Sequence, residues 1–350
     1  MPVTSQVDEA FERRYAELEA FLAADEIEYT VIWPLQGLVG SSFPLRLDPG
    51  LELDVMSDRE LEFALNAGAI WTVFTDDRLF APGPEHRTCA RHRYSLPKVT
   101  GDRDIDESHR VSQDVEGRLQ KLKAVLEESL ALVLPEVVGI AARVTIATRP
   151  GALLSWVATV VPFTVPHIRR LHGVRLSEDD AAELSAAWQL VNAPQHNKGI
   201  ALALRRLSYR AQRERAEDKL LDTMIAAEAL YLTGEGDEKY RGELGHRLAQ
   251  RAALWADPGQ LGYSKREVLD IMKSAYNARS AIAHGGTPKL KDMKVRGQRV
   301  SLLELLPAAR LVITRGARSA LAATACGGSW PPDWDGLALG DLPADTVKTE

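Results

Sequence analysis

The chain has 350 residues and a net charge of −6, with 45% hydrophobic and 26% charged residues. These values are typical of a folded globular protein long enough to hold two domains, and they exclude a disordered or collagen-like chain. The only two cysteines, Cys89 and Cys326, lie far apart in the sequence and suggest neither a disulfide framework nor a zinc knuckle, so a reducing cytoplasm is the expected location.

The first half of the chain alternates between strand and turn signals. Residues 7–22 predict a short amphipathic helix, and leucines at helical spacing predict a longer one over 114–134. β-branched and aromatic residues predict strands at 29–33, 51–55, 70–74, 143–148 and 156–161; the first ends at Pro34, and the last two form a hairpin. The charged stretch 101–110 predicts a loop. We therefore expect a mixed strand and helix domain over residues 1–177, which makes the whole chain an α+β protein.

Nothing in the sequence predicts a membrane segment. The longest apolar stretch, residues 151–166, is interrupted by prolines and is too short to span a bilayer. It predicts a buried strand. The acidic first residues lack the apolar core of a secretory signal.

From residue 178 the pattern becomes helical. Helices are predicted at 178–191, 199–216, 218–232, 239–255, 264–284 and 300–324, with a boundary loop at 192–195. We expect a helical domain over residues 178–325 and an acidic, extended or partly disordered tail over 326–350. Trp330 and Trp334 are expected to anchor this tail on its own domain, with a partner protein as the alternative.

Charge is distributed unevenly along the chain. Residues 1–200 carry 20 lysines and arginines against 30 acidic residues, whereas residues 201–325 carry 22 against 14. A basic segment inside an acidic protein is typical of a surface that binds a polyanion, although solvated helix faces give the same count. Three arginines on the helix at 199–216 are candidates for binding the phosphates of a polyanion, with solvent-facing side chains as the alternative: Arg205, Arg206 and Arg210.

The most informative string runs from Ala275 to Gly286. It places Arg279 five residues before His284, and the two glycines that follow predict the end of the helix at His284. At about 100° per residue, Tyr276, Ser280 and His284 lie on one face with Arg279 at its flank. An imidazole moves protons near neutral pH and a guanidinium stabilises charge on phosphate oxygens, as cleavage of a phosphodiester by a neighbouring hydroxyl requires. The alternative is a helix end whose cations interact with the dipole.

Glu228 is a second candidate. It lies seven residues after Leu221, within the apolar stripe of the predicted helix at 218–232. A carboxylate there needs a partner, because burying it alone costs several kcal/mol. It either orients Tyr276, Arg279 or His284, or joins two helices without a catalytic role.

Other motif classes are missing from the sequence. It contains no phosphate-binding loop, no dinucleotide fingerprint, no nucleophile elbow and no H-E-x-x-H, and the Cys/His spacing around Cys89 lacks a second half. We expect no metal and no cofactor.

Residues 199–286 resemble the Apea-like branch of the HEPN family of helical RNA-binding and RNA-cleaving domains. The resemblance rests on the order and spacing of five segments: Ala201–Leu207, Glu217–Leu230, the loop Thr233–Asp237, Tyr240–Trp255, and Tyr276-x-x-Arg279-Ser280-x3-His284-Gly285. It implies a helical bundle that dimerises and brings Arg279 and His284 to a shared cleft. Tyr276, Asn277, Ser280 and Glu228 would support these two residues.

Many members of the family cut RNA without a metal, as toxins or antiviral effectors, and others only bind RNA or mediate assembly. The resemblance therefore implies an endoribonuclease acting on RNA, with tRNA among the candidates, and a trigger ligand or protein at the N-terminal domain. Active members often carry Asn, Asp or His after the arginine, where this chain has Ser280. That difference keeps a non-catalytic RNA-binding or dimerisation module as the alternative.

Overall fold

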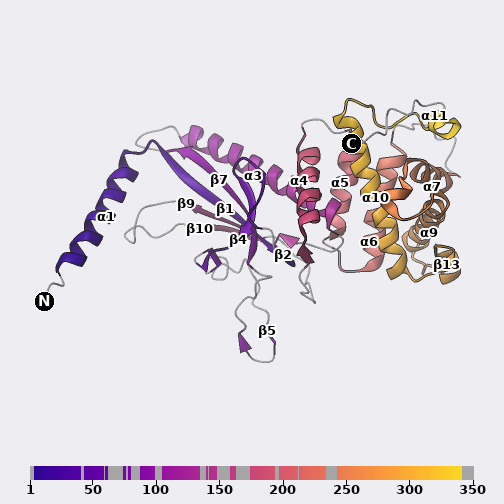
Figure 1. The fold of residues 1–350 in the computed structure, drawn as a ribbon, viewed down its shortest axis with the longest axis horizontal. Helices are drawn as coiled ribbons and strands as arrows, with labels where there is room; N and C mark the ends of the chain where they lie inside the picture. Colours follow the sequence, from indigo (N-terminus) through magenta and orange to yellow (C-terminus); the bar gives the residue numbers. More distant parts are fainter. Residues whose placement is uncertain are drawn as a thin grey trace. The chain divides into compact units, whose positions relative to one another are not determined.

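The computed structural model describes residues 4–40, 43–58, 60–61, 74–75, 78–79, 87–98, 105–134, 139–140, 142–147, 158–162, 174–193, 197–211, 213–233 and 243–340. These divide into two compact units, one of residues 1–121 and 139–181 and the other of residues 122–138 and 182–350. The expected α+β class is confirmed: a curled antiparallel sheet forms the first unit and helices form the second (Figure 1). No helix among the described residues is both long and apolar enough to cross a bilayer.

The sheet of the first unit has seven strands. They follow the order β10-β9-β1-β7-β4-β3, with β8 paired to the end of β1. The strand bounds are β1 Glu26–Gln36, β3 Leu45–Asp48, β4 Leu51–Val55, β7 Thr88–Pro97, β8 Gly139–Ile140, β9 Ala142–Ala147 and β10 Ala158–Pro162. Two-stranded pairs join β2 Leu38–Gly40 to β11 Val174–Leu176, and β5 Phe74–Thr75 to β6 Arg78–Leu79.

Two helices belong wholly or partly to this unit. Helix α1 spans Thr4–Ala23, and α3 spans Ile105–Val133, beginning in the first unit and ending in the second. An ion pair of 2.8 Å between Glu116 of α3 and Arg143 of β9 fixes α3 on one face of the sheet.

The sequence prediction for this unit needs two corrections. β1 continues through Pro34, because this proline falls between the residues that pair with β9, which end at Ile32, and those that pair with β8, which begin at Leu35. Proline has no backbone N–H, but no hydrogen bond to β8 or β9 is lost, because Pro34 pairs with neither of these strands. Helix α3 begins at Ile105, inside the stretch expected to be a loop. The predicted hairpin of β9 and β10 is confirmed, and most of the strand predicted at 70–74 lies outside the described residues.

The second unit is a bundle of helices. Their bounds are α4 Glu178–Asn192, α5 Lys198–Ala211, α6 Ala216–Tyr231, α7 Leu244–Trp255, α8 Pro258–Leu261, α9 Lys265–Ala283, α10 Leu302–Ala325 and α11 Trp334–Leu339. Helix α10 contacts α5, α6, α7 and α9, and the core between them is apolar, with Leu204, Met224, Ile271, Leu305 and Ile313 fully or almost fully buried. Between α9 and α10 lie the short helix η3 Leu290–Asp292 and the strands β12 Lys294–Val295 and β13 Gln298–Arg299.

The tail differs from the extended segment that was expected. Asp333 caps α11 by accepting bonds from the backbone N–H groups of Asp335 and Gly336. The rings of Trp330 and Trp334 pack edge to face against Trp255 of α7, with centroids 4.9 and 6.4 Å away. The two tryptophans therefore anchor residues 326–340 on the helical unit itself, as predicted.

Candidate functional site

Helix α9 carries most of the predicted site, and its two ends are fixed by local sequence. At the start, the Ser264 side chain accepts a bond from the backbone of Glu267, whose carboxylate in turn accepts one from the backbone of Ser264. At the end, Gly285 adopts a left-handed conformation with φ 74°, and the backbone N–H of Gly286 bonds to the Ala281 carbonyl. Helix α9 therefore ends at Ala283 with His284 as its C-cap, within one residue of the end that the two glycines predicted.

Arg279 and Glu228 meet between α9 and α6. An Arg279 Nη atom lies 3.2 Å from a carboxylate oxygen of Glu228, and the two side chains are 29% and 27% exposed. Burial raises the pKa of Glu228, although the positive charge of Arg279 opposes this effect. Glu228 thus holds the arginine in place, and among the described residues no further hydrogen bond occupies the other N–H groups of its guanidinium.

Tyr276 completes this cluster from one helical turn earlier. The Arg279 guanidinium lies 5.9 Å from the centre of the Tyr276 ring. The ring also packs against Gly245 of α7, where an added Cβ would come within 2.5 Å of the ring. The close approach of α7 therefore depends on glycine at 245, and it sets the position of the tyrosine under Arg279.

His284 lies apart from this cluster. Its side chain is exposed, and its backbone N–H donates to the Ser280 carbonyl over 3.2 Å. Ser280 is half-buried and Asn277 is exposed. Among the described residues no hydrogen bond or ion pair joins the side chain of His284 to Arg279 or Glu228. One chain therefore brings together Arg279, Glu228 and Tyr276, and leaves His284 facing solvent at the end of the same helix.

The three arginines of α5 do not share one environment. Arg206 pairs with the buried carboxylate of Asp222 over 3.2 Å, and Arg213 binds the other oxygen of that carboxylate. Arg205 is exposed, whereas burial lowers the pKa of Arg210 to about 10. Their predicted role in gripping RNA stays a prediction, and the Asp222 pair gives Arg206 a structural role besides.

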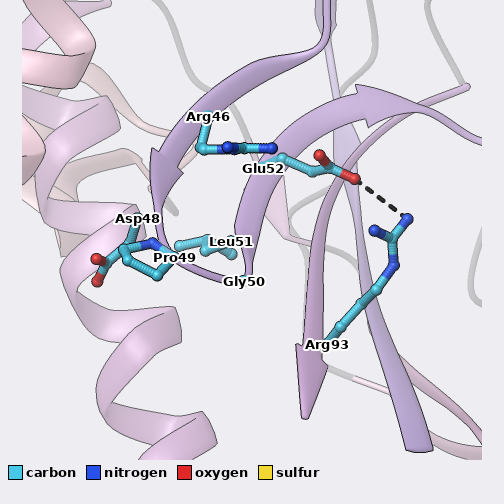
Figure 2. Close-up of a pocket in the computed structure, with 7 residues that line it drawn as sticks. All are labelled: Arg46, Asp48, Pro49, Gly50, Leu51, Glu52 and Arg93. Atoms are coloured by element: carbon cyan, nitrogen blue, oxygen red, sulfur yellow. Dashed lines mark ion pairs between the residues drawn. The ribbon is translucent and has the colours of Figure 1, made fainter.

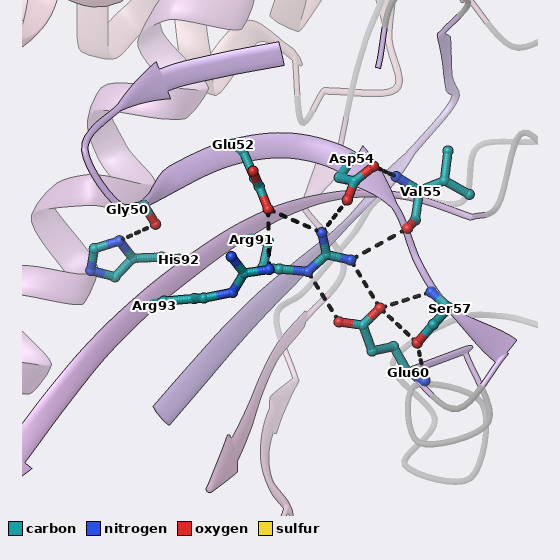
Figure 3. Close-up of polar contacts among 9 residues, drawn as sticks. All are labelled: Gly50, Glu52, Asp54, Val55, Ser57, Glu60, Arg91, His92 and Arg93. Carbon is teal, nitrogen blue, oxygen red and sulfur yellow. Dashed lines mark hydrogen bonds and ion pairs between the residues drawn. The ribbon is translucent and has the colours of Figure 1, made fainter. Parts of the chain in front are cut away.

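An arginine cluster in the first unit was missed by the sequence reading. Arg91 of β7 is almost fully buried and binds the carboxylates of Glu52, Asp54 and Glu60, as Figure 3 shows. Burial alone would lower the pKa of Arg91, but its hydrogen bonds to Glu60 and Asp54 outweigh burial and raise it. Glu52 and Asp54 alternate along β4, which indicates that both side chains point to one face of the sheet. The sequence does not reveal that β4 pairs with β7. Because every side of the guanidinium is engaged, this cluster joins strands and leaves no group free for chemistry.

A shallow pocket of about 260 Å³ lies beside that cluster (Figure 2). It is lined at the β3–β4 turn by Arg46, Glu52 and Arg93, with Asp48, Pro49, Gly50 and Leu51. Arg93 reaches the carboxylate of Glu52 over 3.4 Å. The pocket therefore offers two exposed guanidinium groups, of Arg46 and Arg93, beside the carboxylate of Glu52, which pairs with Arg93.

Among the described residues one free cysteine, Cys89, is buried and the other, Cys326, is exposed. No group of three or more His, Cys, Asp or Glu side chains in this described part of the chain is arranged to hold a metal ion. Cys89 is buried, and burial raises its pKa to about 12, so this thiol stays protonated and inert at neutral pH.

Comparison with known proteins leaves the family resemblance of residues 199–286 as an expectation. No protein-family model matches the chain, and neither the curated proteins nor the solved structures give a match.

Proposed function

We propose that the helical unit is a metal-independent endoribonuclease of the HEPN type, acting in the cytoplasm as a toxin or an antiphage effector. The observation that carries the proposal is the cluster of Arg279, Glu228 and Tyr276, placed on the same helix as the exposed imidazole of His284. A half-buried guanidinium held by one carboxylate is poised to bind a phosphate, and an exposed imidazole is accessible to a large polyanionic substrate.

In the proposed reaction His284 acts on the ribose 2′-hydroxyl. It takes the proton as the 2′-oxygen attacks the adjacent phosphorus, and the bond from phosphorus to the 5′-oxygen breaks. Arg279 stabilises the extra negative charge on the non-bridging oxygens, and Glu228 and Tyr276 keep its guanidinium in place. The 5′-oxygen leaves with a proton from a second imidazole, which His284 of another copy of the chain supplies. The products are a 2′,3′-cyclic phosphate and a 5′-hydroxyl.

The N-terminal unit would restrain or trigger this activity. Its net negative charge is opposite to that of residues 201–325, and its pocket at Arg46 and Arg93 offers a place for a trigger ligand. A protein trigger is the other candidate.

A non-catalytic RNA-binding or assembly module is the second candidate function. Two observations favour it: serine follows Arg279, and His284 has no side-chain bond to Arg279 within the described residues.

Cleavage of end-labelled RNA in EDTA separates the two candidates. We expect the wild type to cut, and His284→Ala to lose about 10²- to 10⁴-fold in rate while staying folded. Arg279→Ala should lose as much, and Arg279→Lys should recover only part, because lysine lacks the planar fork. Arg266→Ala, at the exposed start of α9, is the matched control and should cut like the wild type. Cleavage that survives His284→Ala, or that needs a divalent metal, contradicts the proposal. RNA binding without cleavage under any trigger supports the second candidate.

A further inference from the structure

A second cationic surface follows directly after α9. Residues 289–299, called here the basic hairpin, carry five cationic side chains and one carboxylate, and all six are exposed: Lys289, Lys291, Lys294, Arg296 and Arg299, with Asp292. Within the described residues none of the five cations forms an ion pair. Arginines elsewhere in the helical unit do, as Arg213 does with Asp222 and Arg318 with Glu183. The basic hairpin is therefore a run of five cations that form no ion pair within the described residues. One of them, Arg296, acts on Glu267, whose pKa is lowered by hydrogen bonds to Ser264 and further by the charge of Arg296.

The basic hairpin is a fixed platform. β12 and β13 pair through a two-residue turn in which Arg296 and Gly297 have φ values of 52° and 74°. Met293 is buried, and the backbone N–H of Lys294 donates to the Ser274 hydroxyl of α9 over 3.1 Å. The backbone of the basic hairpin is thus bound to α9, the helix that carries the candidate site.

Two of the cations face each other unfavourably. Lys294 and Arg299 are directly opposed in the antiparallel pair, so their side chains leave the same face with Cβ atoms about 5 Å apart. Arg296, in contrast, bonds to the Gly262 carbonyl and lies 5.2 Å from the centre of the Tyr263 ring. Like charges opposed on a strand pair destabilise it, and an anion bound between them removes that cost. This opposed pair is what points to a ligand.

We propose that the basic hairpin binds the phosphate backbone of the RNA strand that reaches His284, with Lys294 and Arg299 gripping adjacent phosphates. The inference rests on the proposed function for the identity of the polyanion as RNA. Lys294 is bonded to Ser274, ten residues before His284 in α9, which is about 15 Å along the helix. An RNA strand of several nucleotides therefore spans the basic hairpin and His284. An anionic membrane fits less well, because Leu290 is the only large apolar side chain exposed on the hairpin and interfacial binding needs an apolar face.

The test measures binding, so it does not depend on cleavage. A short fluorescein-labelled 2′-O-methyl oligoribonucleotide, which lacks the attacking hydroxyl, is titrated with the full chain at several salt concentrations. Each phosphate contact on a single strand adds about 0.7 to the slope of log Kd against log salt. The double variant Lys294→Gln/Arg299→Gln should therefore lose about 1.4 from that slope and bind about 25-fold more weakly at 0.1 M salt.

The matched control removes the same charge from the first unit. Arg110→Gln/Lys121→Gln replaces two exposed cations of α3 and should bind like the wild type. Equal affinity and slope for the hairpin variant and the wild type overturn the inference, and if His284→Ala still abolishes cleavage the proposed function survives. If the hairpin variant loses RNA binding and the wild type does not cleave RNA, the result supports RNA binding by the basic hairpin and contradicts the proposed nuclease activity. Unchanged RNA binding with lost binding to phosphatidylserine vesicles assigns the surface to a membrane and also overturns the inference.

Discussion

At the scale of single residues, the pair of Arg279 and Glu228 decides how the candidate site is held. Glu228→Ala leaves the half-buried guanidinium without its partner and should lower the free energy of unfolding by about 1–2 kcal/mol. Urea denaturation measures this change. Glu228→Gln keeps the shape of the side chain and one acceptor oxygen, so its free energy of unfolding should fall less than that of the alanine variant. Equal stability of both variants and the wild type would show that the pair adds nothing to the fold.

Glu128 of α3 gives the helical unit a pH dependence. Burial, with a smaller contribution from Glu127, raises the pKa of its carboxyl from 4.5 to about 7 against the opposing charge of Arg205. The folded state then holds the Glu128 proton more tightly than the unfolded chain does. The contribution of Glu128 to the free energy of unfolding therefore falls as pH rises from about 4.5 to about 7 and is constant above.

Glu128→Gln removes this titration. The variant should be more stable than the wild type at pH 8 by on the order of 1–3 kcal/mol, and the difference should shrink towards pH 4. Urea denaturation at both pH values measures the two differences. A difference that is the same at both pH values contradicts the assignment.

At the scale of elements, the close approach of α7 and α9 depends on Gly245. An added methyl group would lie within 2.5 Å of the Tyr276 ring, so Gly245→Ala should force the ring or the helix to move and should cost about 1–3 kcal/mol. Thermal unfolding measures the loss. Gly117→Ala in α3 is the matched control, because nothing lies within 4 Å of the new Cβ, and it should stabilise the chain slightly. Equal effects of the two substitutions would contradict the contact.

Local patterns predicted the long helices and the strands β1, β4, β9 and β10, but they missed β7, the ten-residue strand that lies between β1 and β4 in the sheet. The helices of the second unit follow from the spacing of their leucines, and β4 follows from alternation and the turn before it. The predicted helix at 199–216 runs too far, because α5 ends at Ala211 before the segment where Arg213 reaches Asp222. The short β12–β13 hairpin was not predicted, since two-residue strands give no periodic signal.

The candidate site was only partly predictable, because local spacing does not show which helices and strands pack together. Helical spacing placed Glu228 in an apolar stripe that demanded a partner, and the structure supplies Arg279. Spacing did not reveal that Arg206 is bound to Asp222, because that pairing depends on how α5 and α6 pack. The three carboxylates around Arg91 were missed because strand order is a long-range property.

At the scale of the whole molecule, the proposed cleavage requires a second copy of the chain. Each chain contributes one His284, whereas the proposed cleavage needs both a base and an acid. We therefore expect a symmetric homodimer through the helical unit, with a mass twice that of the 38.5 kDa chain in light scattering at micromolar concentration. A monomer with and without the uncleavable RNA would contradict this expectation and with it the shared site.

The tryptophans that anchor the tail also give the protein an optical signature. Trp255, Trp330 and Trp334 have ring centroids between 4.9 and 6.4 Å apart, near enough for their excited states to couple. Trp330 and Trp334 are both less than a tenth exposed, so all emission from the tail comes from a dry environment while it is docked. Release of residues 326–340 would shift that emission to the red and abolish the coupled circular dichroism band without unfolding a single core helix. Residues 326–340 thus carry an intrinsic fluorescent probe for their own release from the helical unit, against the emission of the other tryptophans among the seven of the chain.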